Sequence, residues 1–90
     1  MPTSLRPLRE MLTEYMNAGL LDEAARTLRE LERRDPKGCA RWAQRLGDVE
    51  RRRGRTAHAA VAYQRAAGAY KRSGHPEWAV ALQATASGLR

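Results

Sequence analysis

Two stretches of the chain, GLLDEAARTLREL at residues 19–31 and GRTAHAAVAYQRA at residues 54–66, carry the pattern that decides the fold. A shift of 35 residues superimposes them and aligns five pairs in total: Met11 with Leu46, Gly19 with Gly54, Ala24 with Ala59, Leu28 with Tyr63, and Leu31 with Ala66. A further step of 34 residues places Leu46 on Val80 and Gly54 on Gly88. Self-similarity at a period of roughly 20–50 residues is typical of repeat architectures. The sequence therefore predicts a structural unit that occurs twice and begins a third time.

Turn signals divide the chain into five segments, at Gly19, at 35–38, at Gly54 and at 73–76. Within the segments, apolar residues recur at the i, i+3, i+4, i+7 spacing of one helix face. We expect five helices, with repeat one at 5–36, repeat two at 39–73 and a final capping helix at 75–88. Thr56 is expected to cap the fourth helix and His75 the fifth, because polar side chains favour the N-cap position. The two glycines are expected to adopt positive φ at the turns.

The composition agrees with an all-α domain that spans residues 1–90. Sixteen alanines, no phenylalanine and few β-branched residues favour close helix packing over a sheet. Cys39 is the single cysteine, which excludes an internal disulfide and favours a reducing compartment. There is neither a signal-peptide pattern nor an apolar run long enough to span a bilayer. We expect a soluble, cytoplasmic protein with no membrane span.

The formal net charge is +7, from fifteen arginines and two lysines against ten acidic residues. Such an excess favours acidic partners: nucleic acid, an anionic membrane surface or an acidic protein segment. Four of the arginines, at positions 51, 52, 53 and 55, surround Gly54. Because Gly54 is the expected turn between two helices, the cluster divides into two pairs. Arg53 and Arg55 flank the turn, and Arg51 and Arg52 lie on the helix before it.

The repeated unit resembles the tetratricopeptide repeat, a helix–turn–helix motif of 34 residues. The first copy reads Met11, Leu12, Tyr15, Gly19, Ala24, Leu28, Leu31 and Pro36, and it departs from the pattern only in the size of Leu12 and Leu31. The second copy matches at Leu46, Gly47, Gly54, Ala59, Tyr63 and Ala66. The resemblance implies a right-handed stack of antiparallel helix hairpins, with two repeats and a C-terminal capping helix.

The chain departs from the family pattern at several positions. Glu50 replaces an aromatic residue, Lys71 replaces the exit proline, and Trp42 and Trp78 each lie one position from the expected tryptophan. Because Glu50 faces the interface within a hairpin, we expect it to pair with a nearby arginine.

Members of this family bind peptides in the groove lined by the first helix of each repeat. Transferred residue by residue, the resemblance implies a groove that contains Arg6, Arg9, Thr13, Met16, Asn17, Arg41, Gln44, Arg45, Asp48, Arg51, Arg52, His75, Trp78 and Leu82. Its six arginines outnumber Asp48, and a guanidinium group suits carboxylates. The prediction is a basic groove for an acidic peptide, with Trp78 or Met16 as an apolar anchor. Thr13 and Asp48 replace the asparagines of the family's carboxylate clamp, so that clamp is not predicted.

We therefore expect a non-enzymatic protein-binding module, such as an adaptor, a scaffold or a small chaperone. Catalytic residues, cofactors and metal ligands are not predicted, because the two histidines and the single cysteine form no known pattern. Two alternatives stay open: a helical protein that binds nucleic-acid phosphates non-specifically, and a homodimer that associates through its C-terminal helix. A further interpretation is that the arginines form only a solvated surface.

Overall fold

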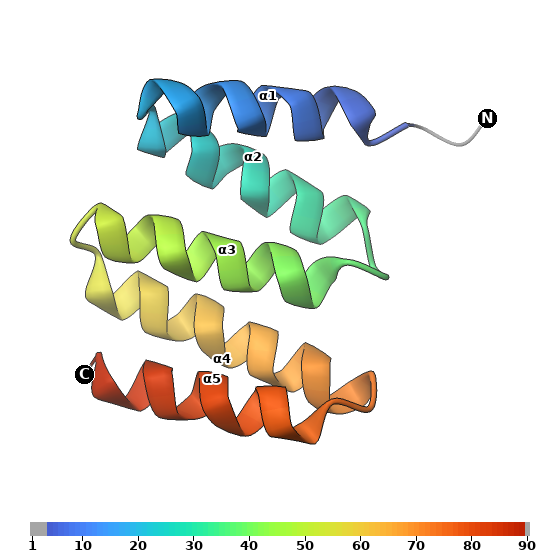
Figure 1. The fold of residues 1–90 in the computed structure, drawn as a ribbon, viewed down its shortest axis with the longest axis vertical. Helices are drawn as coiled ribbons and strands as arrows, with labels where there is room; N and C mark the ends of the chain where they lie inside the picture. Colours follow the sequence, from blue (N-terminus) through green and yellow to red (C-terminus); the bar gives the residue numbers. More distant parts are fainter. Residues whose placement is uncertain (1–3, 90) are drawn as a thin grey trace.

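The structure of the protein, a computed structural model, describes residues 4–89, and these residues form five α-helices without a strand. The helices are α1 (Arg6–Ala18), α2 (Leu21–Arg34), α3 (Cys39–Arg52), α4 (Thr56–Arg72) and α5 (Pro76–Gly88). They follow one another in a row, each antiparallel to the one before (Figure 1). The predicted all-α class is confirmed. Residues 1–3 and 90 of the expected domain lie outside the described residues.

Within residues 4–89, the backbone of each helix packs closely only against the helices that precede and follow it in the chain. Side chains reach further, since the Arg65–Glu32 ion pair joins α4 to α2. α2, α3 and α4 therefore have a neighbour on either side, whereas α1 and α5 have a single neighbour each. This difference explains why positions paired by the repeat differ in burial: Leu46 on α3 is 2% exposed, but Met11 on α1 is 39% and Val80 on α5 is 65% exposed. The right-handed stacking of the hairpins stays a prediction.

The two repeated glycines form the same turn. Gly19 has a φ of 71° and Gly54 a φ of 78°, the left-handed conformation expected at these positions. At both turns the residue after the glycine donates its N–H to the carbonyl oxygen five positions earlier, at 2.9 Å. This hydrogen bond is the mark of a Schellman helix end. The 35-residue repeat thus encodes one hairpin geometry twice.

The turn between α2 and α3 is closed by a carboxylate instead. Asp35 accepts hydrogen bonds from the backbone N–H of Gly38 at 3.3 Å and from Nε1 of Trp42 at 2.9 Å. The indole of Trp42 is otherwise buried in the core. Trp42 therefore packs the core and holds the turn, although it lies one position from the family's tryptophan.

The core consists of two clusters that meet at α3. The first joins α1, α2 and α3 through Leu12, Ala24, Ala25, Leu28, Leu31, Trp42, Leu46 and Val49, together with Ala62 of α4. The second joins α3, α4 and α5 through Ala43, Ala59, Ala60, Tyr63, Ala66, Ala67, Ala79, Leu82 and Ala86. Ala24 and Ala59, which the repeat aligns, are both 0% exposed, as their small size at a helix contact predicts.

Of the two expected caps, Thr56 is wrong, and His75 is right in position but not in its hydrogen bonding. Thr56 is the first residue of α4 and Arg55 is its N-cap, so the threonine lies one position too late to cap the helix. His75 does occupy the N-cap of α5, but its side chain makes no capping hydrogen bond. Its ring instead stacks on Trp78.

Candidate functional site

The helix α3 has two polar sides with different roles. Asp48 and Glu50 are two residues apart, so they project in roughly opposite directions from a helix with 3.6 residues per turn. Asp48 is exposed, whereas the side chain of Glu50 is 1% exposed. The expected groove residues of α3 lie on the Asp48 side. We call the four arginines of this side the basic face: Arg41, Arg45, Arg51 and Arg52.

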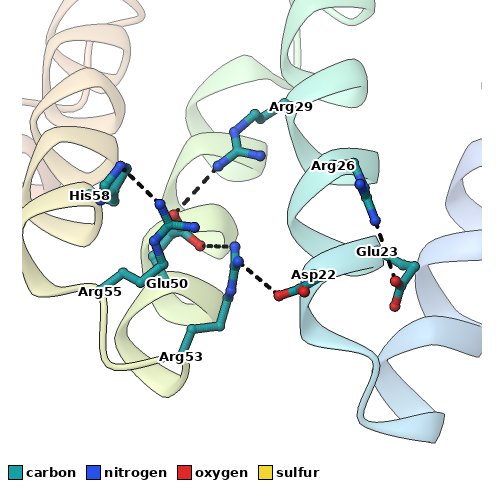
Figure 2. Close-up of polar contacts among 8 residues, drawn as sticks. All are labelled: Asp22, Glu23, Arg26, Arg29, Glu50, Arg53, Arg55 and His58. Atoms are coloured by element: carbon teal, nitrogen blue, oxygen red, sulfur yellow. Dashed lines mark hydrogen bonds and ion pairs between the residues drawn. The ribbon is translucent and has the colours of Figure 1, made fainter.

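On the opposite side of α3, the Glu50 carboxylate forms ion pairs with two arginines (Figure 2). Its carboxylate lies 2.7 Å from Nη1 of Arg53 and 3.5 Å from Nη2 of Arg29. Arg53 also contacts Asp22 of α2 at 2.8 Å, so its guanidinium group bridges two acids. The expectation that Glu50 pairs with an arginine is confirmed. These contacts join α2 to the end of α3, and they occupy Arg53, one of the four arginines around Gly54.

The arginines of α2 are also neutralised by acids. Ion pairs connect Arg26 with Glu23, and both Arg33 and Arg34 with Glu30. Arg65 of α4 reaches Glu32 of α2 at 2.8 Å. Figure 2 shows the first of these pairs on the side of α2 that faces α1. Half of the ten acidic residues thus form ion pairs at α2: Asp22, Glu23, Glu30, Glu32 and Glu50.

The basic face is different. Within residues 4–89, none of its four arginines forms an ion pair with an acid. The guanidinium carbon of Arg45 lies 5.6 Å from the ring centroid of Trp42, a cation–π geometry that holds the side chain but leaves its charge. Arg41, Arg51 and Arg52 are exposed. Positive charge therefore stays available on this side of α3 while the acids neutralise the other side.

Two tyrosines of α4 reach the polar residues between these arginines. The Tyr70 hydroxyl donates to Oε1 of Gln44 at 2.9 Å, and the Tyr63 hydroxyl donates to Asp48. Burial, together with the Asp48 carboxylate, raises the pKa of Tyr63 to about 12, although Arg51 opposes the shift. Tyr63 is therefore a protonated donor at neutral pH. Gln44 and Asp48 consequently help to hold α3 against α4.

The periodicity of the sequence predicts that these tyrosines lie in the core. It does not predict that their hydroxyl groups form hydrogen bonds with polar residues of α3. Tyr63 and Tyr70 are seven residues apart, so they lie on the same side of α4. A buried tyrosine normally finds a hydrogen-bond partner for its hydroxyl. That rule is the sequence signal that could have linked them to polar residues on the neighbouring helix.

The expected groove residues of α1 lie apart from those of α3, because α1 and α3 make no contact. Arg6 is paired with Glu10 at 3.0 Å, and the Thr13 hydroxyl donates to a carbonyl of its own helix. Met16 is half-buried and packs against the first core cluster. The other two expected residues of α1 are exposed: Arg9 and Asn17.

The structure does bring together the expected residues of α3 and α5. Two surface hollows of about 500 and 460 Å³ share Arg41, Tyr70 and Trp78. We call them together the aromatic hollow, whose further lining comprises Asp35, Lys37, Gly38, Ala40, Gln44, Ser73, His75, Ala81, Leu82 and Thr85. Five residues of the expected groove thus meet at one place, and none of the expected α1 residues lines it: Arg41, Gln44, His75, Trp78 and Leu82.

No known protein family, curated protein or solved structure matches the chain. Among the described helices, none is both long enough and apolar enough to cross a membrane. In the part of the chain that the structure describes, no three His, Cys, Asp or Glu side chains cluster as a metal site would require. The basic face and the aromatic hollow are therefore the two features on which a function can be argued.

Proposed function

We propose that the chain is a non-enzymatic protein-binding module, related to tetratricopeptide repeats, whose basic face binds an acidic segment of a partner protein. The partner's carboxylates contact the four arginines along α3. A small helical scaffold of this kind acts as an adaptor or as a chaperone for its partner. A cytoplasmic location is part of the proposal, supported by the single free cysteine, Cys39.

The observation that carries the proposal is the separation of charge between α2 and α3. The arginines of α2 are neutralised by glutamates, whereas those of the basic face have no acidic partner within residues 4–89. An exposed ion pair contributes roughly 0.2–1 kcal/mol. Four such contacts amount to roughly 1–4 kcal/mol, which is enough for a preference but not for tight binding. The basic face therefore selects acidic partners and needs an additional contact for affinity.

The test is the binding of labelled peptides of equal length that differ in charge, measured by fluorescence anisotropy over a series of salt concentrations. We expect an acidic peptide to bind several-fold more tightly than a neutral one at low salt, and the difference to shrink as salt screens the charges. Equal affinity of the two peptides at every salt concentration would refute the proposal.

Homodimerisation is a second candidate, because α5 leaves apolar surface uncovered. Val80 is 65% exposed, and Glu77 is the only charged residue among Pro76–Gly88. Two copies of this cationic chain can pack through α5 without repulsion between arginines, because Pro76–Gly88 contains none. Sedimentation at increasing protein concentration tests this candidate, and a monomer at all concentrations excludes it.

A further inference from the structure

The walls of the aromatic hollow are held in place by their own contacts. The rings of His75 and Trp78 stack with centroids 4.0 Å apart and planes 11° apart. Tyr70 packs edge-on against Trp78, with centroids 5.3 Å apart and planes at 86°, and its hydroxyl is bound by Gln44. A rigid wall binds a ligand without the entropic cost of ordering its own side chains.

Trp78 is nevertheless 49% exposed, so part of its indole is open to a ligand. Next to it, Ala81 and Leu82 of α5 give the lining an aliphatic part. Large, half-exposed aromatic side chains of this kind are enriched among the residues that dominate binding energy at interfaces. The hollow therefore offers an apolar contact that the basic face lacks.

The charged groups of the hollow favour an acidic ligand. Lys37 and Arg41 line it, and neither forms an ion pair within the described residues. Its one carboxylate, Asp35, already accepts hydrogen bonds from Trp42 and Gly38. A ligand that enters the hollow thus meets apolar surface together with uncompensated positive charge.

We propose that the aromatic hollow binds one large apolar side chain, such as leucine, of the acidic segment. Carboxylates beside this residue contact Arg41 and Lys37, and the rest of the segment continues along the basic face. This inference rests on the proposed function and adds the partner's anchor: an apolar residue flanked by acids. An aromatic wall combined with an aliphatic one suits a branched side chain better than the flat base of a nucleic acid.

The experiment compares three peptides of equal length: an acidic peptide with a central leucine, the same peptide with a central alanine, and a neutral peptide with the leucine. Dissociation constants are measured by isothermal titration calorimetry. We expect the acidic leucine peptide to bind roughly tenfold more tightly than the acidic alanine peptide, the gain expected from burying a leucine side chain.

Two variants of the protein test where the leucine binds. Trp78→Ala removes part of the wall, and Ala81→Gln fills the hollow with a larger side chain. Both variants should abolish the preference for leucine.

Val80→Ala is the matched control, because Val80 is exposed on α5 but lines neither part of the hollow. It should retain the wild-type preference, and circular dichroism verifies that all three variants fold.

If both acidic peptides bind equally but better than the neutral one, the leucine anchor is refuted and the proposed role of the basic face stands. If the preference for leucine survives in Ala81→Gln and Trp78→Ala, the leucine binds elsewhere and the inference is wrong. If the acidic leucine peptide binds no better than the neutral one, the proposed function itself fails. Tighter binding of an oligothymidylate than of any peptide at the same salt would overturn both.

Discussion

Gly47 of α3 shows how a single missing carbon atom sets the distance between two helices. A Cβ built on Gly47 would lie 2.6 Å from a ring carbon of Tyr63, closer than such atoms can approach. Without that Cβ, the tyrosine ring lies directly against the α3 backbone and its hydroxyl reaches Asp48. The size of residue 47 therefore controls both the packing of α3 on α4 and one of the hydrogen bonds beside the basic face.

This contact predicts opposite effects of the same substitution at two glycines within helices. Gly47→Ala should lower the free energy of unfolding by about 1–2 kcal/mol, because overpacking costs more than the helix propensity that alanine adds. At Gly68 a Cβ would meet only Nη1 of the flexible Arg72 side chain, at 3.3 Å. Gly68→Ala should therefore be neutral or stabilise the protein by up to about 1 kcal/mol. Urea denaturation of both variants measures the difference, and equal effects would contradict this account of Gly47.

At the scale of the helices, the ion pairs that join α2 to α3 depend on a buried acid, Glu50. We call these contacts the joint between α2 and α3. Glu50 carries the contacts to Arg53 and Arg29, and Arg53 continues to Asp22. The family to which the chain bears a resemblance has an aromatic residue at this position. In this chain the residue at that position is a buried glutamate whose ion-pair network joins α3 to α2.

The joint predicts that Glu50→Gln destabilises the protein by about 1–3 kcal/mol, because it removes the charged partner of two arginines from a buried position. This loss of stability is smaller than that of many broken buried ion pairs, because Asp22 still forms an ion pair with Arg53. Glu10→Gln is the control, since Glu10 and Arg6 form an exposed pair. That variant should change stability by less than about 0.5 kcal/mol. If thermal unfolding shows the same stability for the two variants, the network does not hold the joint.

The elements themselves were predictable because their signals are local. The glycine turns, the proline after α2 and the apolar spacing predict all five helices, and α5, at Pro76–Gly88, agrees within one residue with the capping helix expected at 75–88. The pairing of Glu50 was predictable because an acid at a buried register position requires a cation. The choice of Arg53 and Arg29 was not, since it depends on how two helices are rotated against each other.

The candidate site was predictable only in part. The family resemblance implies that Arg41, Gln44 and Trp78 share a surface, and all three line the aromatic hollow. It does not predict that His75 leaves its capping role to stack on Trp78, or that α4 supplies Tyr70 to the hollow. Both arrangements depend on side-chain contacts between helices, which the spacing of residues along the chain does not encode.

At the scale of the whole molecule, a row of helices that pack mainly against their neighbours should not be equally stable throughout. α3 takes part in both core clusters, whereas α1 buries a single residue, Leu12. In such arrays the end elements open at a lower cost than the central ones.

Hydrogen exchange followed by NMR should therefore show the slowest amides in α3 and α4 and the fastest helical amides in α1. α5 should be intermediate, because it buries Ala79, Leu82 and Ala86. Uniform protection of all five helices would contradict this expectation and would indicate that the row unfolds as one cooperative unit.

The central claim is that the basic face of α3, and not the net charge of the chain, selects an acidic partner. Arg51→Gln/Arg52→Gln and Arg33→Gln/Arg34→Gln test it most directly, since each removes two adjacent arginines from the last turn of a helix and lowers the net charge by two. Arg33 and Arg34 both form ion pairs with Glu30, whereas Arg51 and Arg52 belong to the basic face and form none within residues 4–89. We predict that the α3 variant loses roughly 3- to 30-fold in affinity for an acidic peptide, and that the α2 variant stays within about twofold of the wild type. Equal losses in the two variants would contradict the claim and would leave only the net charge of the chain to explain binding.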